Sequence, residues 1–526
     1  MGCIKILDCT LRDGGYINDW KFGKEAIDGI ISGLVDAKID IIECGFIRYT
    51  DQNEDSSVFS SMDCLSKRLF PKKDGISFAV MIEQHNHVDS CIPPFDGKGA
   101  DIIRVSFRKT EWGEAKETIQ QLKNKGYKVC VQPVGTATYD DESLIKLIKD
   151  VNSISPYAFY LVDTLGMMYT HEMRRFFYLI DNCLSNSIAL GFHSHNNLQL
   201  SFSNAQEMLR LNRKREIIID SSCFGMGRGV GNLATELLAD YVNNNIEQKY
   251  SLIPIMSVID KYLMPIYAKT RWGYDLPYFL SAVFKCHPNY ASYLMKKDTL
   301  DIENIEKILS LLPKQSRSEF DAELIEKIYF DYMNCFYDDS ISIEDLKQRI
   351  YGKIVVLLGP GSSLIHSNHQ LEQIANKNSF IISVNFYTSL FKIDAVFISN
   401  EKRMVQMEKS ALNNVNVLLL TSNLKHSFGN APLVFNYASY LGEGDGSDNA
   451  GAMIIRILKK AGVSKICLAG FDGFDVDSSK NYFLDKYKKD IDYETAMTKN
   501  SVISKQLKLA LDGVNYAFIT ETKYKI

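Results

Sequence analysis

Several common sequence features are missing from this chain of 526 residues. No run of about 18 or more uncharged apolar residues occurs, so we expect no membrane-spanning helix. Basic residues are not in excess: 60 Lys and Arg stand against 64 Asp and Glu, a formal net charge of -4. This balance argues against binding of nucleic acid polymers through an overall positive field. With only 12 prolines and no low-complexity tract, long disordered linkers are not expected either.

The sequence also gives no sign of a disulfide framework or of a signal peptide. The 11 cysteines are scattered and form no CxxC pair. This pattern is typical of a reducing cytoplasm. The N-terminal segment MGCIKILDCTLRDGG carries acidic residues early and runs directly into a strand pattern, so we expect no signal peptide. The sequence therefore predicts a cytoplasmic globular protein.

The first 245 residues alternate β-rich runs with amphipathic helical stretches. Eight apolar runs begin at residues 4, 39, 76, 100, 127, 157, 188 and 216, and each is rich in Ile, Val, Phe or Tyr. Buried parallel strands have this composition. Eight β–α units in about 245 residues predict a TIM (β/α)8 barrel. A doubly wound open sheet is the alternative, but no Gly-rich phosphate loop follows the first run.

The rest of the chain changes character twice. From about residue 250 to 349 apolar residues recur at helical spacing, which predicts a helical appendage. From residue 350, strand-like runs such as KIVVLL and SFIISVNF again alternate with helical stretches. We therefore predict three regions: a barrel over 1–249, a helical region over 250–349 and a Rossmann-like α/β domain over 350–526.

Polar side chains gather where the predicted barrel strands end, which is where TIM barrels carry their active sites. In strand order they are Arg12, Asp13, Glu43, Arg104, Gln132, Asp163, Thr164, His193, His195 and, in the last loop, Asn232.

A metal site is the first function that these residues predict. His193 and His195 are two residues apart on a strand, so both side chains point to the same side. Asp13 at the end of the first strand can join them, and Asn232 could add a carbonyl oxygen. Such a mixed nitrogen and oxygen set suits Mn²⁺ or Mg²⁺, or a catalytic Zn²⁺.

Three ordered motifs give a family resemblance. LDCTLRDGG, GFHSHNNLQLSFSNA and FGMGRGVGNLATELL resemble the DRE-TIM metallolyases, which include 4-hydroxy-2-oxovalerate aldolase, hydroxymethylglutaryl-CoA lyase and isopropylmalate synthase. The resemblance implies that Asp13, His193 and His195 hold the metal, with Asn232 as a further ligand in some members. It also implies that Arg12 contacts the oxyanion of a bound 2-oxo acid. No CoA-specific motif is visible, which favours the aldolase branch.

The remaining barrel positions are assigned more broadly. Glu43 is a catalytic candidate, and Arg104, Gln132, Asp163 and Thr164 are candidates for substrate binding; the alternative for such residues is a set of salt bridges at the top of the barrel.

One position departs from the resemblance. Bacterial 4-hydroxy-2-oxovalerate aldolases carry a histidine shortly after the Arg-Asp pair, and this chain has Tyr16 there. A phenol with an ordinary pKa near 10 is a poorer base at neutral pH. Tyr16 is therefore a candidate acid/base. His287 and Tyr290, in the run HPNY, are alternatives that could equally serve helix packing.

The C-terminal domain has a weaker signature. GPGSSL, SVNF, DAVFISN and the stretch from Asp448 to Asp472 resemble bacterial lipooligosaccharide sialyltransferases and related proteins of surface-glycan pathways. The resemblance implies a nucleotide or nucleotide-sugar site at Gly359, Gly361, Ser362 and Asn385. No histidine follows His426, where those transferases carry a catalytic one, so we expect ligand binding or a diverged transferase. A docking or oligomerisation domain is the alternative.

The combined hypothesis is a metal-dependent aldolase-type lyase or synthase that acts on pyruvate or a related 2-oxo acid and an aldehyde. A place in polysaccharide biosynthesis rests only on the association of the two domains. The alternatives are an acyl-CoA-dependent Claisen synthase and a glycosyltransferase-like binding protein with an inert barrel. We also expect a homo-oligomer.

Overall fold

The structure is a computed structural model that describes residues 3–69, 71–86, 91–211, 215–297, 300–333, 337–366, 378–407, 415–424, 431–484, 487–488 and 490–526. The chain forms two compact units. The first comprises residues 1–292 and 313–320, and the second comprises residues 293–312 and 321–526. The predicted helical region over 250–349 is thus shared between the two units.

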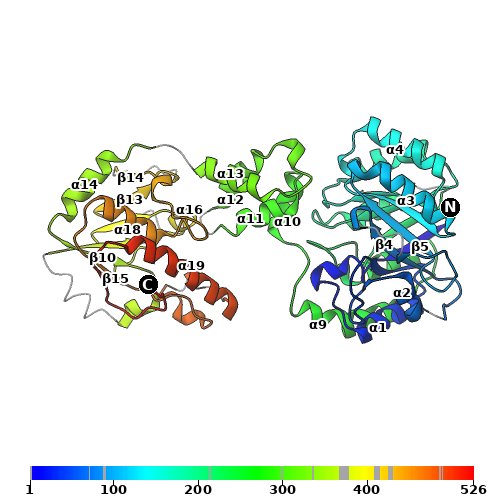
Figure 1. The fold of residues 1–526 in the computed structure, drawn as a ribbon, viewed down its shortest axis with the longest axis horizontal. Coiled ribbons are helices and arrows are strands. Elements are labelled where there is room, and N and C mark those ends of the chain that lie inside the picture. Colours follow the sequence, from blue (N-terminus) through cyan, green and yellow to red (C-terminus); the bar gives the residue numbers. More distant parts are fainter. Residues whose placement is uncertain are drawn as a thin grey trace. The chain divides into compact units, whose positions relative to one another are not determined.

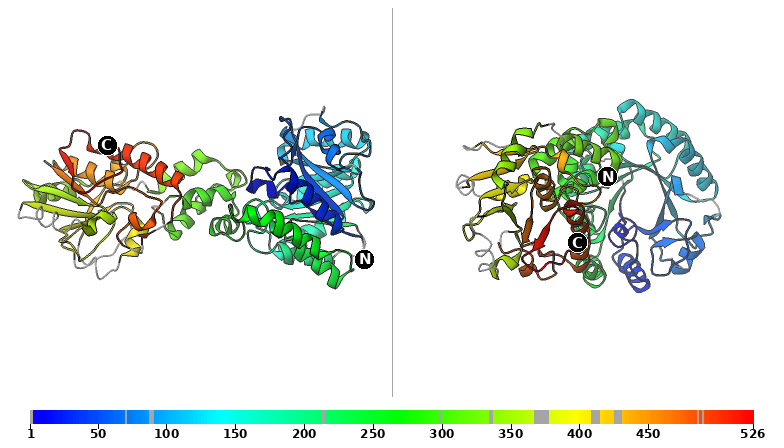
Figure 2. Two further views of the ribbon diagram at one scale, coloured as in Figure 1. Left: turned by 90° about the horizontal axis from the view of Figure 1, so that it is seen from below. Right: turned by 60° about the vertical axis from the view of Figure 1, so that its left-hand side comes forward.

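The first unit is a closed barrel of eight parallel strands, as predicted (Figure 1; Figure 2, right). The ring closes because β1 pairs with both β9 and β2. A short strand that the sequence did not predict, β3 (Val58–Phe59), adds to the edge of β2. The barrel strands are β1 (Ile4–Asp8), β2 (Ile41–Ile47), β4 (Ser77–Glu83), β5 (Ile102–Phe107), β6 (Lys128–Pro133), β7 (Ala158–Asp163), β8 (Ala189–Ser194) and β9 (Ile217–Ser221).

Helices cover the outside of the barrel because successive strand residues point to opposite faces. Ile6 and Ile42, for example, belong to the large outer core between strands and helices, whereas Leu7 and Ile41 belong to the inner core. The helices of this unit are α1 (Lys24–Asp36), α2 (Met62–Leu69), α3 (Trp112–Asn124), α4 (Asp141–Ile154), α5 (Thr170–Cys183), α6 (Ser201–Leu211), α7 (Thr235–Asn245), α8 (Leu252–Val258), α9 (Met264–Tyr267) and α10 (Leu276–Val283). Helix α11 (Pro288–Met295) begins in the first unit and ends in the second.

The second unit contains a parallel sheet of seven strands in the order β14-β13-β12-β11-β10-β15-β16. The five strand-like runs of the sequence become β10 (Ile354–Leu358), β11 (Ser379–Val384), β12 (Ala395–Ile398), β13 (Val417–Thr421) and β15 (Ile466–Ala469). The edge strands β14 (Leu433–Phe435) and β16 (Tyr516–Phe518) were not predicted. This is the expected α/β domain.

Helices complete the second unit (Figure 1). Those in the described part of the unit are α12 (Ile302–Ser310), α13 (Ala322–Met333), α14 (Ser340–Ile350), α16 (Glu401–Gln406), α18 (Ala450–Lys460) and α19 (Tyr493–Leu511). Helix α14 is fixed to the sheet edge by side chains: Asp339, which precedes it, accepts from the backbone N–H of Asn436 at 3.1 Å and from the hydroxyl of Tyr440 at 2.7 Å. No helix in the described part of the chain is long and apolar enough to cross a bilayer.

Candidate active site in the barrel

The polar centre of the barrel follows directly from strand periodicity. Ile102 and Ile218 belong to the inner apolar layer. The residues two positions further along these strands, Arg104 and Asp220, point to the same side and form the next layer toward the C-terminal ends. Gly191 leaves room for this layer, because a Cβ there would lie 2.3 Å from the ring of Tyr160.

A chain of buried charges fills this layer. Glu43 Oε2 accepts from Arg12 Nε at 2.9 Å and from Arg104 Nη1 at 2.7 Å. Arg104 also donates through Nη2 to Asp220 Oδ2, and the same carboxylate oxygen accepts from Nδ1 of His193 at 2.9 Å. All five side chains are buried. Because the Nδ1 proton of His193 is held by Asp220, Nε2 is left with a lone pair for a ligand.

Three candidate metal ligands lie together next to these buried charges. One ligand atom each from Asp13, His193 and His195 lies within 4.8 Å of the others, as the sequence predicted. Asn232 is adjacent, because its Nδ2 donates to Asp13 Oδ2 at 2.6 Å. The buried Oδ1 of Asn232 and Nδ1 of His195 have no hydrogen-bond partner among the described residues. These unpartnered lone pairs beside a carboxylate fit a divalent cation that takes nitrogen and oxygen ligands.

The protonation states suit a metal site as well. Burial alone would raise the pKa of Asp13, but the charge of Arg12 and the neighbouring histidines hold it well below its usual range. Burial lowers the pKa of His195 to about 4, although Asp13 acts in the opposite direction. At neutral pH the site therefore presents an ionised carboxylate and a neutral imidazole, the forms that bind metal ions.

The loop after β9 reaches over this site through glycines. A Cβ on Gly227 would lie 2.3 Å from Asn232 Nδ2 and 2.8 Å from Asp13 Oδ2. Gly231 has φ +96°, and a Cβ there would lie 2.0 Å from the carbonyl oxygen of Gly225. The glycines of this loop are thus required for the close approach that places Asn232 next to Asp13.

Arg12 keeps one donor for a further partner. Its Nη1 donates to Asp13 at 2.6 Å, and its backbone carbonyl accepts from Trp20 Nε1 at 2.7 Å. Its Nη2 is buried without a hydrogen-bond partner in the described structure. A fixed guanidinium with one unused donor is suited to bind an anionic oxygen next to the metal candidates.

Tyr16 lies at the rim of the site, in a 3₁₀ turn over residues 14–17. Its ring packs edge-on against Trp20 with 4.8 Å between ring centroids, and the guanidinium of Arg228 lies 5.7 Å from its ring centre. Burial and the nearby Asp13 raise the pKa of Tyr16, so the phenol keeps its proton at neutral pH.

Two predicted substrate residues lie deep in the barrel. Arg104 is fully buried. With its amide oriented to satisfy both groups, Gln132 accepts from Arg104 Nη2 and Nε at 2.9 and 3.0 Å. These contacts tie both side chains to the buried charges, and their part in substrate binding stays a prediction.

The other two predicted substrate residues hold loops at the barrel rim. Asp163 accepts from the backbone N–H groups of Met167 and Met168 at 3.1 and 3.0 Å, and burial raises its pKa to about 6. Thr164 accepts through its hydroxyl from the N–H of Gly135 at 2.9 Å. Substrate binding by Asp163 and Thr164 also stays a prediction.

The HPNY run divides between two positions. His287 Nε2 lies 2.8 Å from Nη2 of Arg228, which connects it to the loop after β9. Tyr290 is buried, and its hydroxyl bonds the carbonyls of Ser316 and Glu319 at 2.9 and 2.8 Å. Tyr290 thus anchors the appended helices, while His287 lies near the barrel rim.

Two residues of this site were not predicted from the sequence. Asp220 orients His193, yet its only signal was a single acidic residue at the end of the run EIIID. Trp20 has positive φ (+58°) and donates to the carbonyl of Arg12. A positive φ outside glycine is uncommon and cannot be read from a sequence pattern.

The predicted nucleotide residues lie in the second unit. Gly359, Gly361 and Asn385 line one cavity, and Ser362 donates to the carbonyl of Lys480 at 2.9 Å. The backbone N–H groups of the Gly-rich turn are already used: those of Gly359 and Gly361 donate to the carbonyls of residues 469 and 470 at 2.8 and 2.9 Å.

Comparisons with known proteins show what the barrel resembles. The profile of the HMGL-like family matches residues 3–260. The barrel is therefore similar to the HMGL-like family. This agrees with the resemblance to DRE-TIM metallolyases, whereas the likeness of the C-terminal domain to sialyltransferases stays a prediction.

Individual relatives are distant. An oxaloacetate decarboxylase of Mycobacterium tuberculosis is 23% identical over 44% of this chain and 68% of its own. A 4-hydroxy-2-oxovalerate aldolase of Carboxydothermus hydrogenoformans is 26% identical over 50% of this chain and 77% of its own. Among solved structures, the N-terminal domain of a proposed aldolase from Bacteroides vulgatus is 25% identical over 56% of this chain and 97% of its own, with a TM-score of 0.48.

Proposed function

We propose that the barrel catalyses divalent-metal-dependent cleavage or formation of a carbon–carbon bond beside the carbonyl of pyruvate or a related 2-oxo acid. One observation carries the proposal: Asp13, His193 and His195 converge next to a buried Arg12 that has one unused donor. The relatives named 4-hydroxy-2-oxovalerate aldolase and oxaloacetate decarboxylase support it, since both names describe substrates with a 2-oxo group.

The chain's own residues explain how such a reaction would be assisted. A divalent cation held by Asp13, His193 and His195 would supply Lewis-acid charge beside the carbonyl of the 2-oxo acid. Arg12 would donate through Nη2 to the oxygen that becomes negative when the bond breaks. Glu43 and Asp13 hold the guanidinium in place beforehand. A preorganised donor of this kind typically accounts for about 10² to 10³ in rate.

Proton transfer is assigned to Tyr16. Because its pKa is raised, the phenol is an acid rather than a base at neutral pH. It can therefore protonate the enolate carbon, or the alkoxide that forms in the synthetic direction. Cleavage of a 4-hydroxy-2-oxo acid instead needs a base for the hydroxyl proton, which Tyr16 could provide only if its pKa fell on substrate binding.

This difference favours a second candidate, decarboxylation of a 2-oxo acid that carries a second carboxylate on the carbon next to the carbonyl, as oxaloacetate does. Loss of CO₂ leaves the electron pair on the carbon next to the carbonyl, so the enolate forms without any base. The step then needs only a proton donor, which a neutral Tyr16 provides. The identity of an aldehyde partner and a place in surface-glycan biosynthesis remain predictions from the sequence.

The test is a mass-spectrometric screen of the full chain with Mn²⁺ or Mg²⁺. Pyruvate is offered with simple and sugar-derived aldehydes, and oxaloacetate is offered alone. We expect an adduct of pyruvate and one aldehyde, or release of CO₂. The variant His193→Ala should form neither and should hold less metal, whereas His171→Ala, on the exposed face of α5, should behave as wild type. Equal turnover and metal content in both variants would refute the proposal.

Tyr16→Phe separates the two candidates. Aldol turnover should disappear in this variant, because the phenol is the proposed proton carrier. Loss of CO₂ should persist, and the resulting pyruvate should be protonated by solvent without stereochemical preference. Unchanged aldol turnover would exclude the phenol and direct attention to His287 at the barrel rim.

A further inference from the structure

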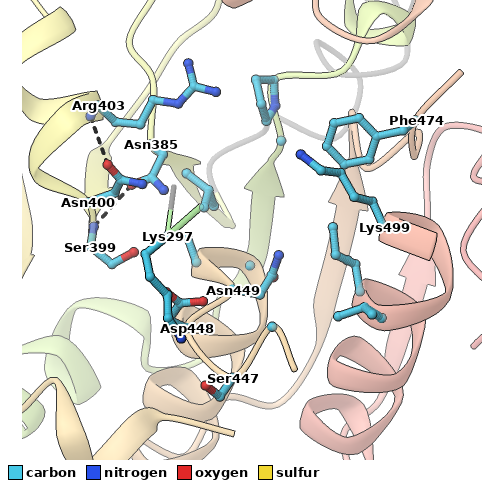
Figure 3. A pocket seen from close by; sticks show the side chains of 18 of the residues that line it. Lys297, Asn385, Ser399, Asn400, Arg403, Ser447, Asp448, Asn449, Phe474 and Lys499 are labelled. Atoms are coloured by element: carbon cyan, nitrogen blue, oxygen red, sulfur yellow. Dashed lines mark hydrogen bonds between the residues drawn. The ribbon is translucent and has the colours of Figure 1, made fainter. Parts of the chain in front are cut away.

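The second unit contains a cavity of about 810 Å³ at the C-terminal edge of its sheet (Figure 3). Its walls include residues that follow β10, β11, β12 and β15. Strand β10 lies where the order of the sheet reverses, with β11 on one side and β15 on the other. Open α/β sheets bind their ligands at this position. The volume falls within the range of small-molecule sites.

The Gly-rich turn after β10 is not the anion site of this cavity. Asp472 occupies it: the carboxylate accepts from the N–H of Ser363 at 2.8 Å and from the Ser363 hydroxyl. A Cβ on Gly361 would lie 2.5 Å from the carboxyl carbon of Asp472. The turn therefore binds a negative charge of the protein itself, and a phosphate there would be repelled.

The start of α18 offers free donors instead. This helix has 11 residues, and its first turn contains no acidic residue, although Asp448 directly precedes the cap residue Asn449 and also lines the cavity. Asn449 caps the helix by accepting from the N–H of Ala452 at 3.0 Å. The N–H groups of Ala450 and Gly451 lie in the first turn, where a helix has no backbone acceptor, and no side chain within the described ranges caps them. Both residues line the cavity.

An unpartnered side chain supports a ligand on the facing wall. Ser399 is only 1% exposed and lines the cavity, yet its hydroxyl has no hydrogen-bond partner in the described part of the chain. Its backbone N–H donates to Oδ1 of Asn385 at 3.1 Å, which fixes this asparagine with positive φ (+59°) beside it. Figure 3 shows Ser399, Asn385 and Asn400 together on one wall, across from Phe474 and Lys499.

Aromatic rings and basic groups form another part of the lining, which also includes the carboxylates of Glu326, Asp445, Asp448 and Asp472. Phe474, Tyr482 and Tyr487 make a row, with ring centroids 6.1 and 6.2 Å apart. A cation covers each end of the row: Lys499 lies 5.2 Å from the centre of the Phe474 ring, and Arg403 lies 4.0 Å from that of Tyr487. Such a row provides apolar contact area for a ring and positive charge for an anion.

We propose that this cavity binds a ring-bearing organic phosphate of nucleotide size, with the phosphate at the start of α18 and the ring against the Phe474, Tyr482 and Tyr487 row. The helix N-terminus and the lysine supply charge for the phosphate. The hydroxyl of Ser399 supplies a donor or acceptor for polar groups on the ring. This site is separate from the barrel chemistry and does not depend on it.

Ala450 gives the sharpest test. Ala450→Asp puts a carboxylate beside the free N–H groups, which stabilises the helix start but repels a phosphate. Ala450→Asn has nearly the same shape without the charge. Isothermal titration of the full chain with nucleoside monophosphates, nucleoside diphosphates and hexose phosphates should show binding to wild type and to Ala450→Asn. We expect Ala450→Asp to bind at least about tenfold more weakly, with an equal or higher Tm.

Further probes keep the proposal falsifiable. Lys499→Gln should weaken binding several-fold, whereas Lys505→Gln, on an exposed position of the same helix, should not. Inorganic phosphate should bind more weakly than the best ester, and Phe474→Leu should remove that difference. The proposal is overturned if no organic phosphate binds at millimolar concentration, or if Ala450→Asp binds as tightly as Ala450→Asn. Preference among the esters shows whether the ring is a base or a sugar.

Discussion

Replacing Asp220 by asparagine removes one negative charge from the middle of the linked series of buried charged side chains in the barrel. In the native protein its Oδ2 is shared by Arg104 and His193, and its side chain is 1% exposed. Burial would raise its pKa, but Arg104 and His193 together lower it, so the carboxylate is ionised at neutral pH. In Asp220→Asn, Arg104 keeps only Glu43 as a charged partner, and Glu43 is already shared with Arg12.

The substitution should lower both the stability of the protein and its metal affinity. Breaking a buried ion pair by removing one partner typically costs about 3–5 kcal/mol, because the other charge stays buried. An asparagine oxygen can still accept from Nδ1 of His193, but it no longer makes the imidazole more basic. Loss of such a supporting carboxylate typically lowers metal affinity about 10- to 100-fold. Both losses should therefore appear together in one variant.

The assay follows the unfolding transition of the barrel in urea. Metal affinity is measured by titration of the metal-free protein with Mn²⁺. Asp181→Asn is the matched control, since Asp181 bonds the buried Arg215 at 2.8 Å but is 41% exposed. Exposed pairs contribute about 0–1 kcal/mol, so this control should lose little stability and no metal affinity. If Asp220→Asn is as stable as Asp181→Asn and binds Mn²⁺ as tightly as wild type, the supporting role of Asp220 is wrong.

Three further substitutions test the barrel. Arg12→Lys keeps the positive charge but loses the planar guanidinium, so turnover should fall by about 10² to 10³ while metal content is unchanged. Turnover and metal content are measured on the same preparation. Asp163→Asn tests the pH dependence of the free energy of unfolding. Because the pKa of Asp163 is raised to about 6, its proton stabilises the folded protein, and this stabilisation is fully present below pH ~4 and is lost as pH rises through 6. The variant should gain up to about 3 kcal/mol on wild type between pH 4 and 7 in urea unfolding, and a constant difference would contradict this. Gly227→Ala should abolish metal binding, because its Cβ would meet Asn232 and Asp13; retained binding would show that the loop can move.

Strand periodicity and strand order were enough to predict the core of the barrel site. Eight apolar runs predicted eight parallel strands, and the rule that strand ends converge brought Asp13, His193 and His195 together from positions about 180 residues apart. The structure has this ring and this cluster. These features depend on backbone geometry, which repeats in every barrel.

Side-chain partners could not be predicted in the same way. Asp220 and Asp472 illustrate the limit: one holds His193 and the other fills the Gly-rich turn, each over a separation in sequence that no periodicity encodes. The turn GPGSS had the composition of a phosphate loop, but composition does not show that its N–H groups already have acceptors. The edge strands β14 and β16, each three residues long, were too short to stand out.

The buried side chains that form ion pairs with Arg12 and Arg104 outnumber these two arginines. Arg12 and Arg104 contribute two positive charges, whereas Asp13, Glu43 and Asp220 contribute three negative ones. Among these five ion-paired side chains there is thus one surplus negative charge. A divalent cation would convert this surplus to one positive charge, which the single carboxylate of pyruvate would cancel. These five side chains together would therefore repel an anionic substrate in the absence of a cation. They would no longer repel it once a divalent cation is bound.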